Sequence, residues 1–135
     1  MNKKNFIKLG KNIIDLEIKG LRKLKKVLNN SFNEAVSQIV KCQSKVILCG
    51  VGKSGLIAQK IAATLSSVGT PSFCLSASDS SHGDLGSISK KESILYAASD
   101  IKLLIPKVKE AGGIVPTSST TSQLALGDAL AISSM

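Results

Sequence analysis

Three polar stretches of this 135-residue chain combine side chains that could bind or transform a small charged molecule. The first is GVGKSG at residues 50–55, between an apolar strand-like run and a helix-like run. Its glycines would let the backbone approach a bound group, and the amides that open a helix favour an anion. A lysine and a hydroxyl beside the glycines suit a phosphomonoester. The alternative is a tight turn that needs glycine only for packing.

The same glycine spacing, G-x-G-x-x-G, is also typical of dinucleotide sites, which would make the protein a nicotinamide-dependent oxidoreductase. Such sites carry an acidic residue near the end of the next strand, where it holds a ribose hydroxyl. The next strand-like run of this chain ends at Leu75-Ser76, without an acid. The oxidoreductase hypothesis therefore rests on the glycine pattern alone and is disfavoured by Ser76.

The second stretch, DSSHGDLG at residues 79–86, contains His82, the only histidine of the chain. It follows a strand-like run, and the carboxyl ends of parallel strands line the ligand crevice of open α/β sheets. His82 could transfer protons near neutral pH, with Asp79 or Asp84 orienting its ring. An exposed loop histidine without a role is the alternative. One histidine and scattered cysteines do not make a zinc site, so no metal is expected.

The third stretch, PTSSTT at residues 116–121, places five consecutive hydroxyl side chains where a last apolar helix begins. One N-cap needs a single such side chain. The additional hydroxyls could bind the hydroxyl groups or the phosphate of a sugar. Ordinary capping is the alternative, with Thr120 and Gln123 as a capping box.

The elements that must position these stretches alternate between strands and helices. Residues 46–49, 72–75 and 93–98 form short apolar runs, which are typical of parallel strands buried on both faces. A helix is expected over residues 56–68, ended by Gly69 in a left-handed conformation. The pattern predicts an α/β fold with a three-layer, doubly wound sheet.

Helical periodicity lies on both sides of this pattern. Residues 11–28 form one amphipathic stretch, and a second helix is expected to start at a capping box formed by Ser31 and Glu34. These two helices would form an N-terminal hairpin. A further helix is expected over residues 101–110, with a kink or a late start at Pro106.

Composition narrows the possible partners and the compartment. The formal charge is +9, and residues 1–45 hold eleven Lys/Arg against three acids. We interpret this basic region as a solvated helix face rather than a nucleic-acid or membrane patch, because no arginine cluster or interleaved aromatics accompany it. Three cysteines without a CxxC pair fit a reducing compartment. No secretory signal and no apolar run of ~20 residues is found, so a cytoplasmic protein is expected.

The trio GVGKSG, SHGDLG and PTSSTT, in this order, resembles the sugar isomerase (SIS) domain, and within it the arabinose 5-phosphate isomerase family of Kdo and lipopolysaccharide biosynthesis. The similar stretches are residues 46–63, 64–85 and 116–131. The resemblance implies an N-terminal helical lead-in over residues 1–44 and a partial SIS domain over residues 45–135, without CBS modules. The implied architecture is a three-layer α/β/α fold with an incomplete parallel sheet.

The activity that the resemblance implies is reversible isomerisation of D-arabinose 5-phosphate and D-ribulose 5-phosphate through an enediol, without a cofactor. A phosphorylated pentose would be the substrate, and a homo-oligomer, a dimer or tetramer, is expected. Carried over by position, Lys53 and His82 would be catalytic. The substrate-binding residues would be Gly52, Ser54, Thr117, Ser118, Ser119 and Thr120.

The chain also departs from the family pattern. The Ser-x-Ser-Gly-Glu-Ser/Thr loop after the third strand is absent, because Ala97-Ala98-Ser99 runs straight into Asp100. A stretch that would hold the fourth strand and most of the fifth is missing between Glu110 and Ala111. Ser76-Ala77 replaces a His-Pro pair, and the His-Pro-Gly-Gly segment would lie beyond Met135.

These departures predict a truncated or internally deleted relative of weak or absent activity. Each acid–base group is worth ~10²–10⁴ in rate, so the loss of a carboxylate and a histidine would be severe. A non-catalytic, SIS-type module that binds sugar phosphates is therefore the alternative to an isomerase.

Overall fold

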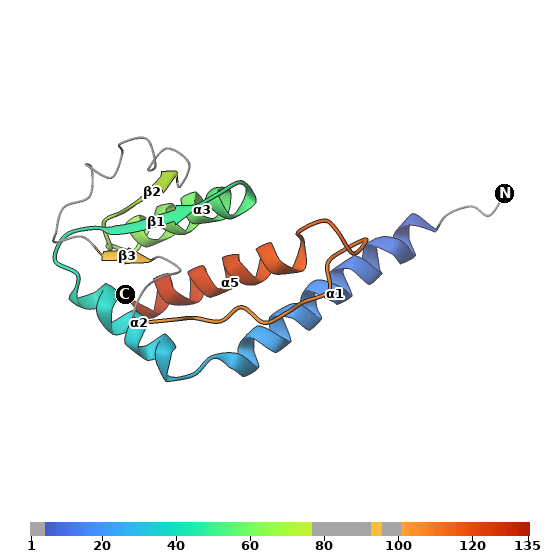
Figure 1. Ribbon diagram of the computed structural model, residues 1–135, viewed down its shortest axis with the longest axis horizontal. Coiled ribbons are helices and arrows are strands. Elements are labelled where there is room, and N and C mark those ends of the chain that lie inside the picture. Colours follow the sequence, from blue (N-terminus) through green and yellow to red (C-terminus); the bar gives the residue numbers. More distant parts are fainter. Residues whose placement is uncertain (1–4, 77–92, 96–100) are drawn as a thin grey trace.

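The computed structural model of the chain describes residues 5–76, 93–95 and 101–135 (Figure 1). The helices and strands follow in the order α1 (Phe6–Val27), α2 (Asn30–Lys41), β1 (Val46–Gly50), α3 (Lys53–Ser67), β2 (Ser72–Ser76), β3 (Ser93–Leu95) and α5 (Ser118–Ser133). All three predicted strands and four of the five predicted helices are present. The α/β fold class is thereby confirmed.

The sheet is parallel and has the strand order β2-β1-β3, with β1 in the centre. Val46, Ile47 and Leu48 of β1 are 0%, 0% and 5% exposed. Because successive side chains of a strand point to opposite faces, both faces of β1 are buried. This confirms the two-sided parallel sheet that the continuous apolar runs predict.

Helices α3 and α5 run side by side in the same direction, so both begin on the same side of the molecule (Figure 1). Ser54 contacts Gln123 near the start of each helix, and Lys60 contacts Asp128 further along. Gly127 permits the close approach, since a Cβ atom there would lie 2.3 Å from Ile61 Cδ1. The packing of α3 on α5 therefore fixes the relative position of the two helix starts.

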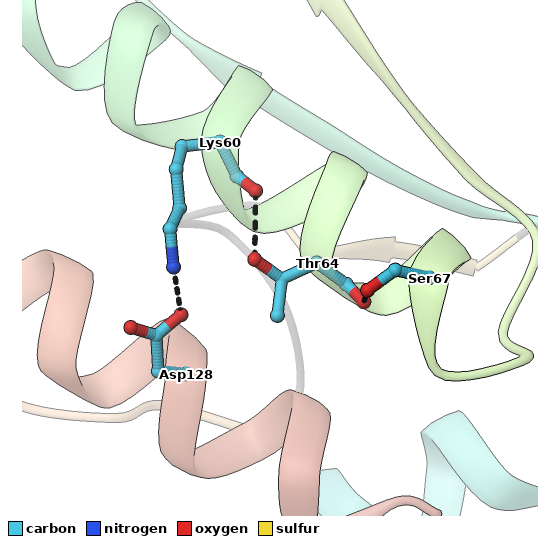
Figure 2. Close-up of polar contacts among 4 residues, drawn as sticks. All are labelled: Lys60, Thr64, Ser67 and Asp128. Carbon is cyan, nitrogen blue, oxygen red and sulfur yellow. Dashed lines mark hydrogen bonds and ion pairs between the residues drawn. The ribbon is translucent and has the colours of Figure 1, made fainter.

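Figure 2 shows the polar contacts along the exposed side of this helix pair. The ammonium of Lys60 pairs with the Asp128 carboxylate, and the two side chains are 47% and 41% exposed. Thr64 Oγ1 donates to the carbonyl of Lys60 at 3.0 Å, and Ser67 Oγ donates to the carbonyl of Thr64 at 2.7 Å. Only the Lys60–Asp128 pair among these contacts crosses between the helices.

The N-terminal hairpin packs against the rest of the chain. Helix α1 lies along α5, and α2 joins the apolar core between the sheet, α3 and α5. The core residues are Ala35, Ile39, Val46, Leu48, Ala58, Ala62, Leu65, Leu130 and Ala131. No helix in the described part of the chain combines the length and apolar character needed to cross a bilayer.

The predicted helix over residues 101–110 is wrong. This segment, which we call the strap, has no regular secondary structure from residue 102 to residue 110 and runs beside α1 (Figure 1). Pro106 lacks an amide donor, would clash inside a helix, and biases Ile105 toward an extended backbone. Partly buried Ile101, Leu103 and Ile105 alternate with exposed residues, which is a period of two rather than 3.6.

The capping box expected at the start of α2 is also wrong. The helix starts at Asn30, and the Asn29 side chain is the cap that accepts from the Ser31 amide at 3.0 Å. Glu34 instead accepts from the Asn30 side chain at 3.0 Å. Asparagine caps a helix as well as serine does, so the earlier residue takes the position.

Candidate functional site

The turn between β1 and α3 depends on its glycines. Gly52 has φ +57° and ψ −129°, a conformation almost restricted to glycine. A Cβ atom on Gly50 would lie 2.8 Å from the Gly55 amide nitrogen, and one on Gly55 would lie 3.0 Å from the Gly50 oxygen. Packing therefore requires glycine at positions 50 and 55, and the backbone conformation requires it at position 52. The same turn brings the start of α3 directly to the end of β1.

The start of α3 is open. Gly52 is the N-cap and provides no side-chain hydrogen bond, so the first amides of the helix are left for solvent or a ligand. Lys53 is exposed at the first helical position. Within the described residues its ammonium has no carboxylate partner. The helix dipole and this cation together favour an anion here.

The start of α5 is closed by a carboxylate from the strap. Glu110 Oε2 accepts from the Thr117 amide at 2.7 Å and from Thr117 Oγ1 at 3.2 Å. The Ser119 amide donates to Glu110 Oε1 at 3.2 Å. Burial raises the pKa of Glu110, but the hydrogen bonds from Ser119 and Thr117 outweigh it, and the pKa lies below its ordinary value. Glu110 is therefore an ionised cap on this helix.

Most hydroxyls of the PTSSTT stretch bind the protein itself. Ser118 Oγ donates to the Lys109 carbonyl at 3.0 Å, and Thr120 Oγ1 donates to the Thr117 carbonyl at 2.9 Å. Ser122 Oγ, one residue beyond the stretch, donates to the Ser118 carbonyl at 2.8 Å. Ser118 and Ser122 are fully buried. The structure places Ser118 inside the molecule, whereas Thr117, Ser119 and Thr120 are partly exposed.

The α5 cap differs from the predicted capping box. Thr117 is the N-cap and Thr120 lies inside the helix, so the box of Thr120 and Gln123 is wrong. Gln123 Oε1 instead accepts from Ser54 Oγ at 3.3 Å. This bond joins the first turn of α3 to α5. The structure thus brings Ser54 of the GVGKSG stretch against the helix that follows PTSSTT.

A pocket of about 250 Å³ lies beside this bond, between β1, α3, α5 and the strap. Apart from Ser54 and Gln123, its lining is apolar or a cysteine: Leu48, Cys49, Ile57, Ala58, Ile61, Ile105, Leu126, Gly127 and Leu130. A sugar phosphate needs many polar partners, so this interior does not suit one. The polar turns at the helix starts remain the candidate site.

The remaining predictions concern the histidine loop, a ribose-binding acid and a metal site. His82, Asp79 and Asp84 fall within residues 77–92, so the sequence-based prediction for them stands without a structural account. Strand β2 ends at Ser76, which carries no carboxylate for a ribose. In residues 5–76, 93–95 and 101–135, no three potential metal ligands come together.

The three cysteines are free and half-buried. Burial raises the pKa of the Cys74 thiol, and neighbouring Cys49 raises it further, so the thiol stays protonated near neutral pH.

Sequence reasoning missed Glu110. Its contact with Thr117 depends on a chain reversal at Gly112 and Gly113, which have φ of +64° and +77°. A glycine pair shortly before a hydroxyl-rich helix start, with an acid just ahead of the pair, is a signal that could have indicated the cap.

Comparisons with known proteins identify relatives of this chain. No family model matches the chain. The arabinose 5-phosphate isomerase KdsD of Yersinia pestis is 36% identical over 166 residues, and that of Escherichia coli K12 is 32% identical. Each alignment covers 95% of this chain and 51% of the relative, so the chain spans about half the length of these curated relatives.

The alignments also show an internal difference. They extend over 166 positions, although the whole chain has 135 residues. The relatives therefore contain residues within the aligned region that this chain lacks. This agrees with the sequence analysis, which predicts that a loop and strands of the family are missing.

Solved structures give the same assignment. The structure of Escherichia coli CFT073 c3406 in complex with arabinose 5-phosphate matches with a TM-score of 0.88 and 30% identity, covering 98% of this chain and 90% of that one. A Bacteroides fragilis structure matches with a TM-score of 0.87 at 24% identity, which supports the fold alone. This chain belongs to the arabinose 5-phosphate isomerase family and has its SIS-type α/β fold in incomplete form.

Proposed function

We propose that this chain carries a sugar-phosphate isomerase site for D-arabinose 5-phosphate and D-ribulose 5-phosphate, in the synthesis of Kdo for lipopolysaccharide. The observation that supports it most is the open, cationic turn at residues 50–55, placed at the carboxyl end of β1 in a chain of this family. The carboxyl ends of parallel strands are where α/β proteins bind ligands.

Aldose–ketose isomerisation needs a base for the carbon-bound proton, an acid for the carbonyl oxygen, and a grip on the phosphate. In the proposal the amides of Lys53 and Ser54, together with the Lys53 ammonium, hold an anionic group of the substrate at the start of α3. His82 transfers the proton. Thr117, Ser119 and Thr120 border the sugar from α5.

A non-catalytic module that binds sugar phosphates is the second candidate. Two observations favour it. The chain lacks residues that its relatives contain inside the aligned region, and Glu110 already occupies the Thr117 and Ser119 amides. Losing single acid–base groups lowers rates by ~10²–10⁴ each, so binding with little turnover is its expected behaviour.

The remaining parts of the proposal rest on the family. They are the division into a helical lead-in over residues 1–44 and a partial SIS domain over residues 45–135, assembly as a homo-oligomer, and a cytoplasmic location.

The deciding experiment is turnover of D-ribulose 5-phosphate by the purified chain, shown to be folded by circular dichroism. His82→Ala and Lys53→Ala test the proposed catalytic groups. Lys41→Ala removes a cation from the last residue of α2 and is the matched control. Isomerase activity that both test variants lose, and that the control keeps, supports the isomerase.

A folded chain that binds D-arabinose 5-phosphate without turnover supports the binding module. A folded chain that neither binds nor turns over either pentose phosphate contradicts both candidates. Calorimetric titration with NAD tests the oxidoreductase hypothesis on the same sample.

A further inference from the structure

We propose that the exposed N-terminal half of α1 pairs with the same helix of a second copy of this chain, in antiparallel orientation. The inference goes beyond the proposed function, because it concerns a surface of α1 rather than the candidate site at the starts of α3 and α5. It assigns a specific surface and a specific pairing to self-association.

Helix α1 carries apolar side chains on two faces, and only one of these faces is covered. Gly20 and Leu24 are buried on the covered face, and α1 packs along α5. Ile7, Ile14 and Ile18 are 74%, 58% and 39% exposed. With 3.6 residues per turn, these three isoleucines lie about 80–120° around the helix from Leu24. We call them the α1 stripe.

The α1 stripe lies in the part of the helix that has the least cover. Figure 1 shows the N-terminal end of α1 extending past α5 and the strap. Phe6 and Leu9, near that end, are 73% and 54% exposed. Single exposed apolar residues are ordinary, but several large ones within three to four turns of one helix indicate an interaction surface.

The charges beside the stripe fit a second copy of the same helix. In an antiparallel pair centred between residues 12 and 13, Ile7 faces Ile18 of the second copy, and Lys8 lies beside its Asp15. Two-fold symmetry makes each contact occur twice. Lys8 and Asp15 are exposed, and neither forms an ion pair within the described residues. The pairing therefore joins apolar to apolar and cation to anion.

A parallel pair fits the charges less well. It would place Lys11 against Lys11 of the second copy, where like charges repel. In the antiparallel pair Lys11 instead lies beside Ile14 of the second copy. There its aliphatic stem can cover the apolar side chain while the ammonium reaches water.

An anionic membrane is also a poorer fit than a second copy. Its surface would attract the lysines of α1 but would repel the carboxylates of Asp15 and Glu17. At 3.6 residues per turn these two acids flank the α1 stripe on opposite sides, where they would face the lipid headgroups. The charge pattern thus favours pairing of the chain with itself.

The contact is short, which sets the expected affinity. Residues 7–18 overlap over about 17 Å at 1.5 Å per residue. This is less than a standard interface of about 1,600 Å² requires. The packing of α1 on α5 already orders the helix, so pairing does not have to fold it. We expect a dissociation constant of about 10–100 µM.

The test is sedimentation equilibrium of the full chain over about a hundredfold range of concentration around this value. Ile14→Lys places a second cation beside Lys11 of the other copy. Val40→Lys is the matched control, because Val40 is a β-branched residue of α2 that is 62% exposed. Circular dichroism checks that each variant is folded.

A charge exchange tests the antiparallel orientation. Lys8→Asp and Asp15→Lys each bring like charges together, and the double variant restores opposite charges between copies. Residues 8 and 15 are about 10 Å apart along one helix, so a rescue reports a contact between two copies.

We expect self-association of the wild-type chain, at least tenfold weaker association of Ile14→Lys, and no change for Val40→Lys. Each single charge variant should weaken association about fivefold, and the double variant should regain the wild-type affinity. Failure of this rescue overturns the antiparallel pairing.

A wild-type chain that stays monomeric, or that associates as well with Ile14→Lys as without it, overturns the inference. Co-sedimentation with phosphatidylglycerol vesicles tests the membrane as the other occupant, and a monomer that binds these vesicles assigns the stripe to lipid instead. A monomeric chain that binds D-arabinose 5-phosphate overturns the inference and leaves the proposed function standing.

Discussion

The two helix starts near the carboxyl end of β1 differ in what covers them. The start of α3 follows a glycine cap without a side chain and exposes Lys53. The start of α5 has more polar side chains, yet Glu110 and the protein's own carbonyls engage most of them. The stretch with more potential ligand-binding groups is thus the less accessible one.

This difference shows why a count of hydroxyls is a poor guide to a binding site. Buried polar groups must be hydrogen-bonded, so a hydroxyl-rich helix start inside a packed region serves the fold first. Glycines leave the backbone amides free, because they cannot cap the helix with a side chain. An open backbone and a nearby cation therefore predict anion binding better than side-chain hydroxyls do.

The largest effect is expected from closing the α3 turn with Gly50→Ala. The new Cβ would lie 2.8 Å from backbone atoms of Ser54 and Gly55, which cannot turn aside as a side chain could. We expect a loss of about 3 kcal/mol in the free energy of unfolding, measured with urea. Gly10→Ala in α1 is the control, since nothing lies within 4 Å of its Cβ. A similar loss in both variants would show that the turn has no special packing requirement.

The second effect is expected from uncapping α5 with Glu110→Gln. At pH 7 we expect the free energy of unfolding to fall by about 2 kcal/mol, because the charge-assisted hydrogen bonds to two amides are weakened. The pKa of Glu110 is lowered by folding, so its stabilisation is fully present above the ordinary pKa of about 4.3 and is lost as pH falls through the lowered value.

Unfolding at pH 7, 5 and 3 measures this dependence. The difference in the free energy of unfolding between the wild-type chain and Glu110→Gln should be constant down to pH 5. It should shrink below the ordinary glutamate pKa. A difference that is unchanged or larger at pH 3 would show that Glu110 does not act as an ionised cap.

A smaller effect is expected from Lys53→Met, which removes the cation at the open helix start and leaves its backbone amides. Affinity for D-arabinose 5-phosphate should fall about tenfold, or about 1.4 kcal/mol, with little change in stability. Calorimetry on this variant and on Lys41→Met compares two exposed lysines. Equal affinities of the Lys53→Met and Lys41→Met variants would show that the anion does not bind at the start of α3.

The smallest effect is expected from the Lys60–Asp128 pair, which joins α3 to α5 away from their starts (Figure 2). Both side chains are about half exposed, so water and salt screen their attraction. A double-mutant cycle with Lys60→Met and Asp128→Asn should give a coupling of about 0.5 kcal/mol or less. A coupling of several kcal/mol would show that this pair, rather than the packing of Gly127 on Ile61, sets the helix spacing.

The sequence predicts those parts of the fold that local patterns determine. Continuous apolar residues at 46–48 indicate a strand buried on both faces, and Gly69 ends α3 with φ +97° as expected. A helix is predicted over the strap only if Pro106 is interpreted as a kink or as a late helix start, whereas the strap has no regular secondary structure on either side of Pro106. The alternate burial along the strap depends on which side chains face the core, and that is set by tertiary packing.

The candidate site is predictable only in part. The turn at residues 50–55 follows from glycine chemistry, which the sequence displays directly. The burial of Ser118 depends on α1, where a Cβ on Gly20 would lie 3.6 Å from Ser118 Cβ. No local pattern encodes that contact between residues so far apart in the chain, so the hydroxyls could not be sorted into structural and accessible ones from the sequence.

The most direct test of the difference between the two helix starts is an amide-resolved NMR titration of the wild-type chain with D-arabinose 5-phosphate. We expect the amides of Lys53 and Ser54 to shift on binding, while those of Thr117 and Ser119 stay in place because Glu110 holds them. Shifts of the Thr117 and Ser119 amides in the wild-type chain, at the same ligand concentration, would contradict the closure of α5 by Glu110.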